Sequence, residues 1–321
     1  MKTKAALSIV LAAAAFAAHA QQPWPSRPIR VVTPTSTGGT LDIIARPWAD
    51  QMARVTGQPW VVDNRPGGQG VPGTLAASKA APDGYTFFLG STENLVFAPR
   101  LVKDVGYDPV ADFDLVAIVI DTTAFGVIAH RELPAGNLRE LIALAKARPG
   151  KLTYAVTGGM ADLVGQWLNK QTSTDVVQII YKAIAQMTPD ITGGRLDYVI
   201  NALPPMETLI KAGKLKVLAV TSRSRLPGWE NIETVGETVP GLFLAGFLAL
   251  AAPAGTPVEI RERVNRETVA IVGSPAFTEK LATSGWHNAR PARNVQETVE
   301  FVRGERERWH RILDGLAIKP K

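Results

Sequence analysis

Short apolar stretches alternate with glycine-rich loops and amphipathic stretches along most of the chain. The apolar residues 29–32 predict a strand, and the apolar residues after it recur at helical spacing: Leu41, Ile44, Ala45, Trp48 and Met52. Further strands are predicted at 60–62 and 85–89, with a helix over 74–81 between them. This order of strand, loop and helix is typical of a parallel sheet with right-handed crossovers.

The same pattern returns in the second half of the chain. Strands are predicted at 116–120, 125–129, 152–156, 176–181, 196–201 and 215–221, and helices at 138–147, 163–170, 187–192 and 206–212. A proline-rich break at 253–257 precedes three more predicted helices, 258–272, 275–284 and 295–313. Two α/β units, with the helical tail packed on the first, predict two lobes with a cleft between them.

The loops after the first three predicted strands are rich in Gly, Ser and Thr. Sheets of this kind bind ligands at the carboxyl ends of their strands. Backbone N–H groups in such loops, and at helix N-termini, suit an anion. The pattern therefore favours a site for a small anionic ligand.

The first twenty residues have the pattern of a secretory signal. Lys2 and Lys4 precede a small-residue apolar run, and Ala18-His19-Ala20 is a signal peptidase motif. The run is shorter than the ~20 residues of a membrane span. A buried N-terminal helix, the alternative, would carry polar residues on one face. We expect export, with a mature chain that starts at Gln21.

Composition excludes several classes of site. The chain has no Cys, which excludes disulfides, thiol chemistry, thiolate metal sites and a lipid anchor on cysteine. The net charge of +6 falls to +4 when Lys2 and Lys4 leave with the signal, and basic residues alternate with acidic ones. We therefore expect no nucleic-acid partner, although a mild positive field favours small anions.

Candidate catalytic groups are few. After the signal only His130, His287 and His310 remain, and none lies in a context typical of a general base. The chain has neither a G-x-S-x-G elbow nor an H-E-x-x-H motif. We therefore expect no catalytic residues, no metal site and no cofactor.

One cofactor motif is formally present. Residues 68–73 read G-x-G-x-x-G, and Glu93 follows Gly73 by 20 residues, as in a dinucleotide-binding fold. However, residues 63–67 separate the first glycine from its strand, and Pro72 removes an N–H from the turn that would face phosphate. A structural or ligand-facing turn is the favoured interpretation.

Five segments together resemble the periplasmic solute receptors of tripartite tricarboxylate transporters, the Bug receptors. They are PTSTGGTLDIIAR at 34–46, VVDNRPG at 61–67 with Gly70 and Gly73, APDGYT at 81–86, GKLKVLAVT at 213–221 and APAGTP at 252–257. Each segment is short, but their order and spacing extend over nearly the whole mature chain.

The resemblance implies a fold, domain boundaries and a cellular location. The fold is an α/β clamshell of the type II periplasmic-binding-protein kind, in which each lobe is a mostly parallel sheet flanked by helices. We expect a signal peptide at 1–20, a first lobe at 21–123 plus 249–321, and a second lobe at 124–248. The implied location is the periplasm of a Gram-negative bacterium, and the expected state is a monomer.

The resemblance also implies where a carboxylate ligand lies. The first-strand loop binds one carboxylate through backbone N–H groups and waters, and loops of the second lobe hold the other end. The expected ligand-binding residues are Thr35, Ser36, Thr37, Gly38, Gly39, Thr40, Ser91, Thr92, Asn94, Val156, Thr157, Gly158, Tyr181 and Asn201. Four residues are expected to support the loops: Asp42, Gly67, Gly70 and Gly73.

Departures from the family pattern bear on ligand identity. The loop at 154–162 is shorter than in relatives, lacks their His and contains Val156 and Met160. This favours an aromatic or longer dicarboxylate, such as a phthalate-type diacid (terephthalate, for example), over citrate. Lobe closure would capture the ligand for a membrane permease pair. An exported α/β enzyme, or a receptor that feeds a sensor kinase, is the alternative.

Overall fold

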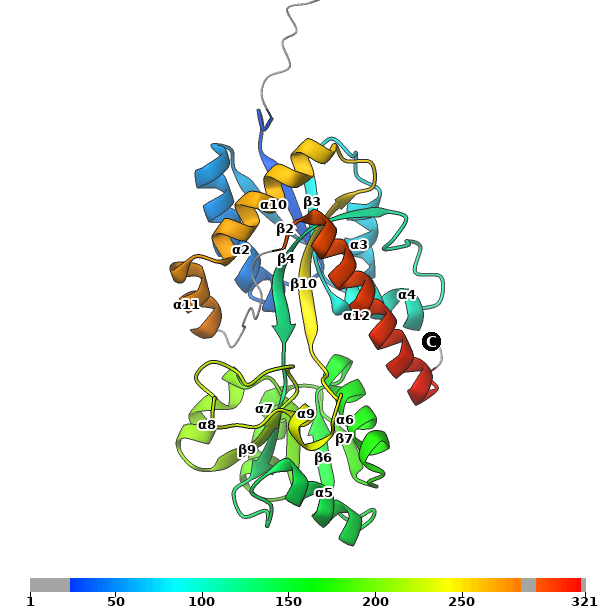
Figure 1. Ribbon diagram of the computed structural model, residues 1–321, viewed down its shortest axis with the longest axis vertical. Coiled ribbons are helices and arrows are strands. Elements are labelled where there is room, and N and C mark those ends of the chain that lie inside the picture. The colour runs from blue at the N-terminus through cyan, green and yellow to red at the C-terminus, as the bar shows by residue number, and fades with distance from the viewer. Residues whose placement is uncertain (1–23, 284–292, 319–321) are drawn as a thin grey trace, which may run out of the picture.

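The computed structural model describes residues 24–283 and 293–318 and forms two lobes, each built on a five-stranded sheet (Figure 1). The predicted signal peptide and His287 lie outside these residues. In the described part of the chain, no helix combines the length and the apolar character of a membrane span.

The first sheet has the strand order β2-β1-β3-β10-β4. Its strands are β1 (Ile29–Thr33), β2 (Trp60–Asn64), β3 (Thr86–Ser91), β10 (Gly246–Pro253) and β4 (Phe113–Thr123). β1 pairs in parallel with β2 and β3, whereas β10 is antiparallel to both β3 and β4. Four strands therefore share one direction, and β10 alone runs against them.

The second sheet repeats this plan, with the order β7-β6-β8-β5-β9. Its strands are β5 (Gly126–His130), β6 (Thr153–Val156), β7 (Val177–Ile180), β8 (Tyr198–Asn201) and β9 (Leu215–Val220). β6 is parallel to β7 and β8, and β5 is antiparallel to β8 and β9. The two mostly parallel sheets, each flanked by helices, confirm the predicted α/β fold class.

Helices cover the first sheet. They are α2 (Thr40–Thr56), α3 (Val71–Ser78), α4 (Ala98–Leu101), α10 (Val258–Val272) and α11 (Pro275–Thr283), together with the short turns η1 (Gly68–Gly70) and η2 (Glu93–Phe97). α2 buries Trp48, whose ring packs edge-on against Trp60 at 5.2 Å between centroids. The apolar stripe seen in the sequence is thus the face that α2 presents to the core.

The second lobe has helices α5 (Leu138–Ala147), α6 (Gly159–Thr172), α7 (Ile184–Thr192), α8 (Glu207–Lys211) and α9 (Val235–Thr238), with the turn η3 (Pro204–Met206). Asn137 caps α5 by accepting a hydrogen bond from the Glu140 N–H at 2.9 Å. Inside this lobe Tyr154 and Tyr198 stack at 5.5 Å on neighbouring strands. Their burial fixes the register of β6 against β8.

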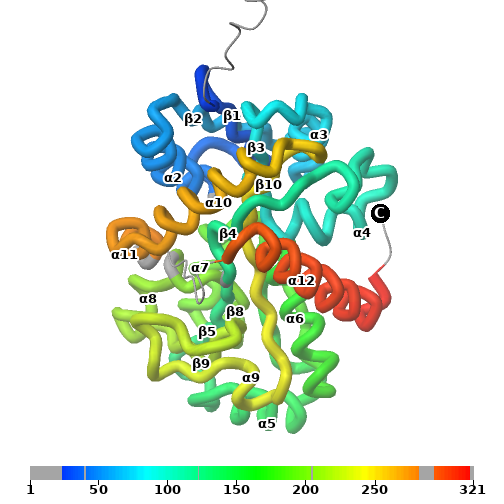
Figure 2. The backbone as a smooth tube through the Cα atoms, turned by 45° about the horizontal axis from the view of Figure 1, so that its top comes forward, coloured from blue at the N-terminus to red at the C-terminus, as the bar shows by residue number. Residues whose placement is uncertain are grey.

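The chain crosses between the lobes twice through strands. It leaves the first lobe along β4 and returns along β10, and these two strands run side by side (Figure 1). The C-terminal helix α12 (Val295–Leu316) lies across both lobes, in contact with β4 above and α6 below (Figures 1 and 2). The residue boundaries predicted for the lobes, at 123/124 and 248/249, stay a prediction.

Candidate ligand-binding site

The strand registers bring the carboxyl ends of both sheets to the junction between the lobes. Ser91, at the end of β3, pairs with Leu248, two residues after β10 begins. In the second lobe Asn201, at the end of β8, pairs with Gly126, the first residue of β5. Because β10 and β5 both start at the crossing, the loops after β1, β3, β6 and β8 lie at this junction.

Asp42 holds the loop that follows β1. It is 2% exposed and accepts hydrogen bonds from the Gly38 N–H at 2.8 Å, Arg46 Nε at 2.9 Å and Asn64 Nδ2 at 2.9 Å. Burial by itself raises the pKa of Asp42, but the hydrogen bonds from Arg46, Gly38 and Asn64 outweigh it, so the pKa lies below its usual value. The Asp42 carboxylate therefore faces its own loop.

The rest of this loop is small and partly exposed. Thr37 Oγ1 donates to Asn64 Oδ1 at 3.3 Å, and Ser36 is exposed. Gly39 is the N-cap of α2 and has no side chain to cap it; the helix begins at Thr40. Thr35 Oγ1 is shut off from solvent and has no hydrogen-bond partner in the described structure. Such a group costs about 1–3 kcal/mol unless something pairs with it.

The second glycine-rich loop packs beneath the first. A Cβ on Gly73 would lie 2.8 Å from the Arg65 carbonyl oxygen and 3.1 Å from Pro34 Cα, so only glycine fits there. Gly70 and Gly67, the other two predicted supports, both have positive φ. Residues 67–73 thus hold Pro34, at the root of the first loop, in place.

The residues after β3 are engaged in hydrogen bonds of their own. Ser91 Oγ donates to Asn94 Oδ1 at 3.1 Å, and the Phe247 N–H donates to Thr92 Oγ1 at 2.8 Å. All three side chains are buried. They fix the turn and tie it to β10, and their role toward a ligand stays a prediction.

In the second lobe the predicted residues lie at the ends of β6, β7 and β8. Val156 is fully buried, Thr157 is exposed, and Gly158 is the N-cap of α6. Asn201 is 6% exposed, and its Nδ2 has no partner within the described residues. The Tyr181 hydroxyl donates to Asp190 at 2.6 Å, so that group is already occupied.

Glu93 joins the two lobes and was missed as a site residue in the sequence. Its Oε1 lies 3.1 Å from the position that a Cβ on Gly159 would take, and the Met160 N–H hydrogen-bonds to its carboxylate. The residue is exposed, yet the packing around its carboxyl raises its pKa, and the Met160 N–H lowers it in part. In the sequence, the only sign of this role is the position of Glu93 between two predicted ligand-binding residues, Thr92 and Asn94.

Met160 makes a second contact at the junction. A Cβ on Gly246 would lie 2.6 Å from Thr123 Oγ1, 2.8 Å from Thr92 Oγ1 and 2.9 Å from Met160 Cε. The Met160 side chain is 8% exposed and belongs to the main core cluster. The start of α6 therefore packs directly against the strands that connect the lobes.

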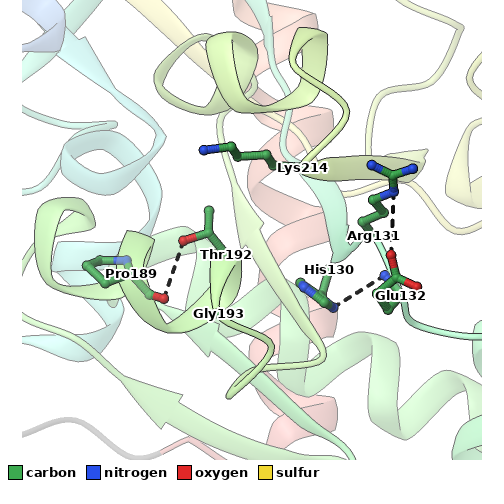
Figure 3. Close-up of a pocket in the computed structure, with 7 residues that line it drawn as sticks. All are labelled: His130, Arg131, Glu132, Pro189, Thr192, Gly193 and Lys214. Carbon is green, nitrogen blue, oxygen red and sulfur yellow. Dashed lines mark hydrogen bonds and ion pairs between the residues drawn. The ribbon is translucent and has the colours of Figure 1, made fainter.

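A cavity of about 440 Å³ lies elsewhere, at the opposite end of β5. It opens between His130, Arg131 and the end of α7, with Lys214 on its rim (Figure 3). His130 Nδ1 accepts the Glu132 N–H at 3.3 Å. None of the predicted ligand-binding residues lines this cavity, so we place the candidate site at the junction. Across residues 24–283 and 293–318, no group of three or more His, Asp or Glu side chains is arranged to hold a metal.

Comparison with known proteins identifies the family. A model of the tripartite tricarboxylate transporter family receptor matches residues 44–318. The chain belongs to this family. A UPF0065 protein of Bordetella bronchiseptica is 32% identical over 316 residues, which cover 98% of this chain and 93% of that protein. Receptors of this family are periplasmic solute-binding proteins.

Solved structures agree with this assignment. The R. palustris protein Rpa4515, solved with adipate, is 32% identical and has a TM-score of 0.77, covering 93% of this receptor and 100% of that chain. The periplasmic binding protein BugD is 27% identical with a TM-score of 0.74, over 93% of this receptor and all of that chain. The two-lobed arrangement of the receptor is therefore the family fold.

Proposed function

We propose that this receptor captures a small carboxylate between its lobes and delivers it to the permease subunits of a tripartite tricarboxylate transporter. It would act in the periplasm as a monomer, after export through residues 1–20. Family membership supports the receptor role. Adipate in the relative of known structure supports a carboxylate ligand.

One structural feature supports a site at the junction between the lobes. Two helices, α2 in the first lobe and α6 in the second, begin at glycine N-caps that provide no capping side chain, Gly39 and Gly158. The loop that contains Glu93 lies beside the first and touches the second. Helix N-termini attract anions, and Thr35 and Asn201 add unpartnered polar atoms at the same ends of the sheets.

The mechanism is closure without chemistry. A ligand that contacts both loops binds best when the lobes are together, so it shifts the population toward the closed form. The prediction of an aromatic or longer dicarboxylate stays open. Val156 and Met160, on which it depends, both have buried side chains.

A thermal-shift screen of the mature protein tests the proposal. The panel contains C4 to C6 diacids, citrate, amino acids, benzoates, phthalate isomers and nicotinate. A true ligand raises the melting temperature in a dose-dependent way, and at 100 times Kd it adds about 2.7 kcal/mol to the free energy of unfolding. If no carboxylate shifts the melting temperature, the proposed function is wrong.

A further inference from the structure

Glu93 is the charged side chain that the first lobe places at the start of α6. It lies two residues after the end of β3 and begins the turn η2. Its Oε1 lies 3.1 Å from the Cβ position of Gly159, and it accepts the Met160 N–H. A residue of one lobe thus satisfies a backbone donor at the helix N-terminus of the other.

The start of α6 would otherwise attract a ligand carboxylate. This helix has 14 residues, and its first positions, Gly158 and Gly159, have φ of 88° and 60° and no side chains in the way. An anion near such a terminus is stabilised by its N–H groups and dipole. The Glu93 carboxyl already occupies that terminus, so the second carboxylate of a diacid would meet another carboxyl group there instead of free N–H donors.

The Glu93 carboxyl has no cationic partner within residues 24–283 and 293–318. No salt bridge to it occurs among the described lysines and arginines. Packing around the carboxyl raises the pKa of Glu93, and the hydrogen bond from the Met160 N–H lowers it in part. No neighbouring charge contributes to this shift. Lys182, the cation next to the predicted residue Tyr181, is exposed and forms none of these ion pairs. A ligand group that donates a hydrogen bond would therefore complement Glu93 better than one that accepts.

A second, independent group at this end is neutral. Asn201 is 94% buried, and its Nδ2 has no partner among residues 24–283 and 293–318. Its Oδ1 already accepts the Ala202 N–H at 2.8 Å, so Nδ2 is the atom left for a ligand. A carboxyl acceptor in one lobe and an amide donor in the other suit a hydroxyl or amide group, which both donates and accepts, more than a dianion.

We propose that Glu93 determines specificity: the loop after β1 binds the ligand carboxylate, and Glu93 excludes a second carboxylate and selects a far end that donates a hydrogen bond. The ligand class is then a small carboxylate with an amide, hydroxyl or ammonium group at its other end. This inference rests on the proposed function and narrows it, because it disfavours the diacid predicted from the sequence.

Matched ligands of one length test the inference. For a six-carbon body the set is adipate, its monoamide and 6-aminohexanoate; for an aromatic body it is terephthalate, its monoamide and 4-(aminomethyl)benzoate. Binding is measured by calorimetry on the mature protein and on Glu93→Gln. Glu262→Gln, at an exposed position of α10, is the matched control.

We expect the wild-type protein to bind the monoamide or the amine at least tenfold more tightly than the diacid of the same length. Glu93→Gln should tighten diacid binding about tenfold and weaken amine binding by a similar factor, and Glu262→Gln should leave all values unchanged. A wild-type preference for the diacid, or the same preference in Glu93→Gln, would overturn the inference. If other carboxylates bind but no member of either set does, the inference also fails. If no carboxylate binds at all, it is the proposed function that fails.

Discussion

At the scale of single residues, buried polar groups divide into those with partners and those without. Asp42 belongs to the first kind, because three donors, one each from a loop, helix α2 and strand β2, converge on its carboxylate. Thr35 belongs to the second, because its hydroxyl is shielded from solvent and has no hydrogen-bond partner among the described residues. The two should respond to mutation in opposite ways.

Asp42→Ala should lower the free energy of unfolding by about 2 kcal/mol at pH 7, because Asn64 Nδ2 and the Gly38 N–H lose a charged acceptor. The folded pKa of Asp42 is depressed, so its stabilisation is complete above the unfolded pKa of about 3.9. It is lost as the pH falls through the lower, folded value. Urea unfolding between pH 7 and pH 3 should show the gap between wild type and variant closing below about pH 4. Asp50→Ala, at an exposed position of the same helix, should change little at any pH.

Thr35→Val should weaken carboxylate binding about three- to tenfold while the ligand-free melting temperature stays the same or rises. The valine keeps the shape and removes a hydroxyl that has no partner to lose. Thr172→Val is the contrast, since Thr172 Oγ1 donates to the Leu168 carbonyl at 2.7 Å. It should lower the melting temperature and leave Kd unchanged. A stability loss in Thr35→Val without a change in Kd would contradict the binding role.

At the scale of elements, α12 fastens the first lobe to the chain that returns from the second. Glu305 is 5% exposed and accepts from Arg223 Nη2 at 2.8 Å and from Arg308 on its own helix. Arg308 also donates to the carbonyl oxygens of Phe243 and Ala245, both at 3.0 Å. The segment that leads into β10 is therefore held by one charged cluster.

Glu305→Ala should lower the free energy of unfolding by about 3 kcal/mol, because Arg308 would remain buried without its carboxylate. Urea unfolding followed by circular dichroism measures the loss. Glu307→Ala, at an exposed position two residues further along α12, should cost less than about 0.5 kcal/mol. Equal losses in the two variants would show that the cluster adds nothing beyond helix content.

The elements also show how far a sequence can be interpreted. The helix predicted at 258–272 is confirmed residue for residue as α10. Its apolar residues recur with the helical period, because one face is buried and the other is polar. Strand β10 was not predicted, because all eight of its residues are buried and alternation disappears. The contact of Glu93 with Met160 was equally hidden, since it joins two lobes that are distant in the chain. Local periodicity predicts elements but not which loops meet.

At the scale of the whole molecule, the two lobes depend on one tightly packed point where they connect. Gly246 begins β10 and donates its N–H to Thr123 Oγ1 at 3.1 Å, while Thr92 hydrogen-bonds to the next residue. Met160 reaches the same point from α6. Small changes at this position should alter the angle between the lobes rather than either lobe alone.

Gly246→Ala should lower the melting temperature and enlarge the radius of gyration, because its Cβ would lie 2.6–2.9 Å from atoms of both lobes. The expected stability loss is about 1–3 kcal/mol. Small-angle scattering with and without ligand measures the shape. Gly304→Ala has no atom within 4 Å of its new Cβ and should keep the wild-type shape and be slightly more stable. A wild-type scattering profile for Gly246→Ala would contradict this view of the hinge.

The position of β10 also dictates an order of assembly. Among the described residues it is the last strand, yet it lies between β3 and β4 and is the one described strand of the first sheet that pairs with β4. The first sheet therefore cannot close until residue 253 is available, whereas all strands of the second sheet lie between residues 126 and 220. During synthesis or passage across a membrane, the second lobe can fold first, and the first lobe waits for the chain to come back.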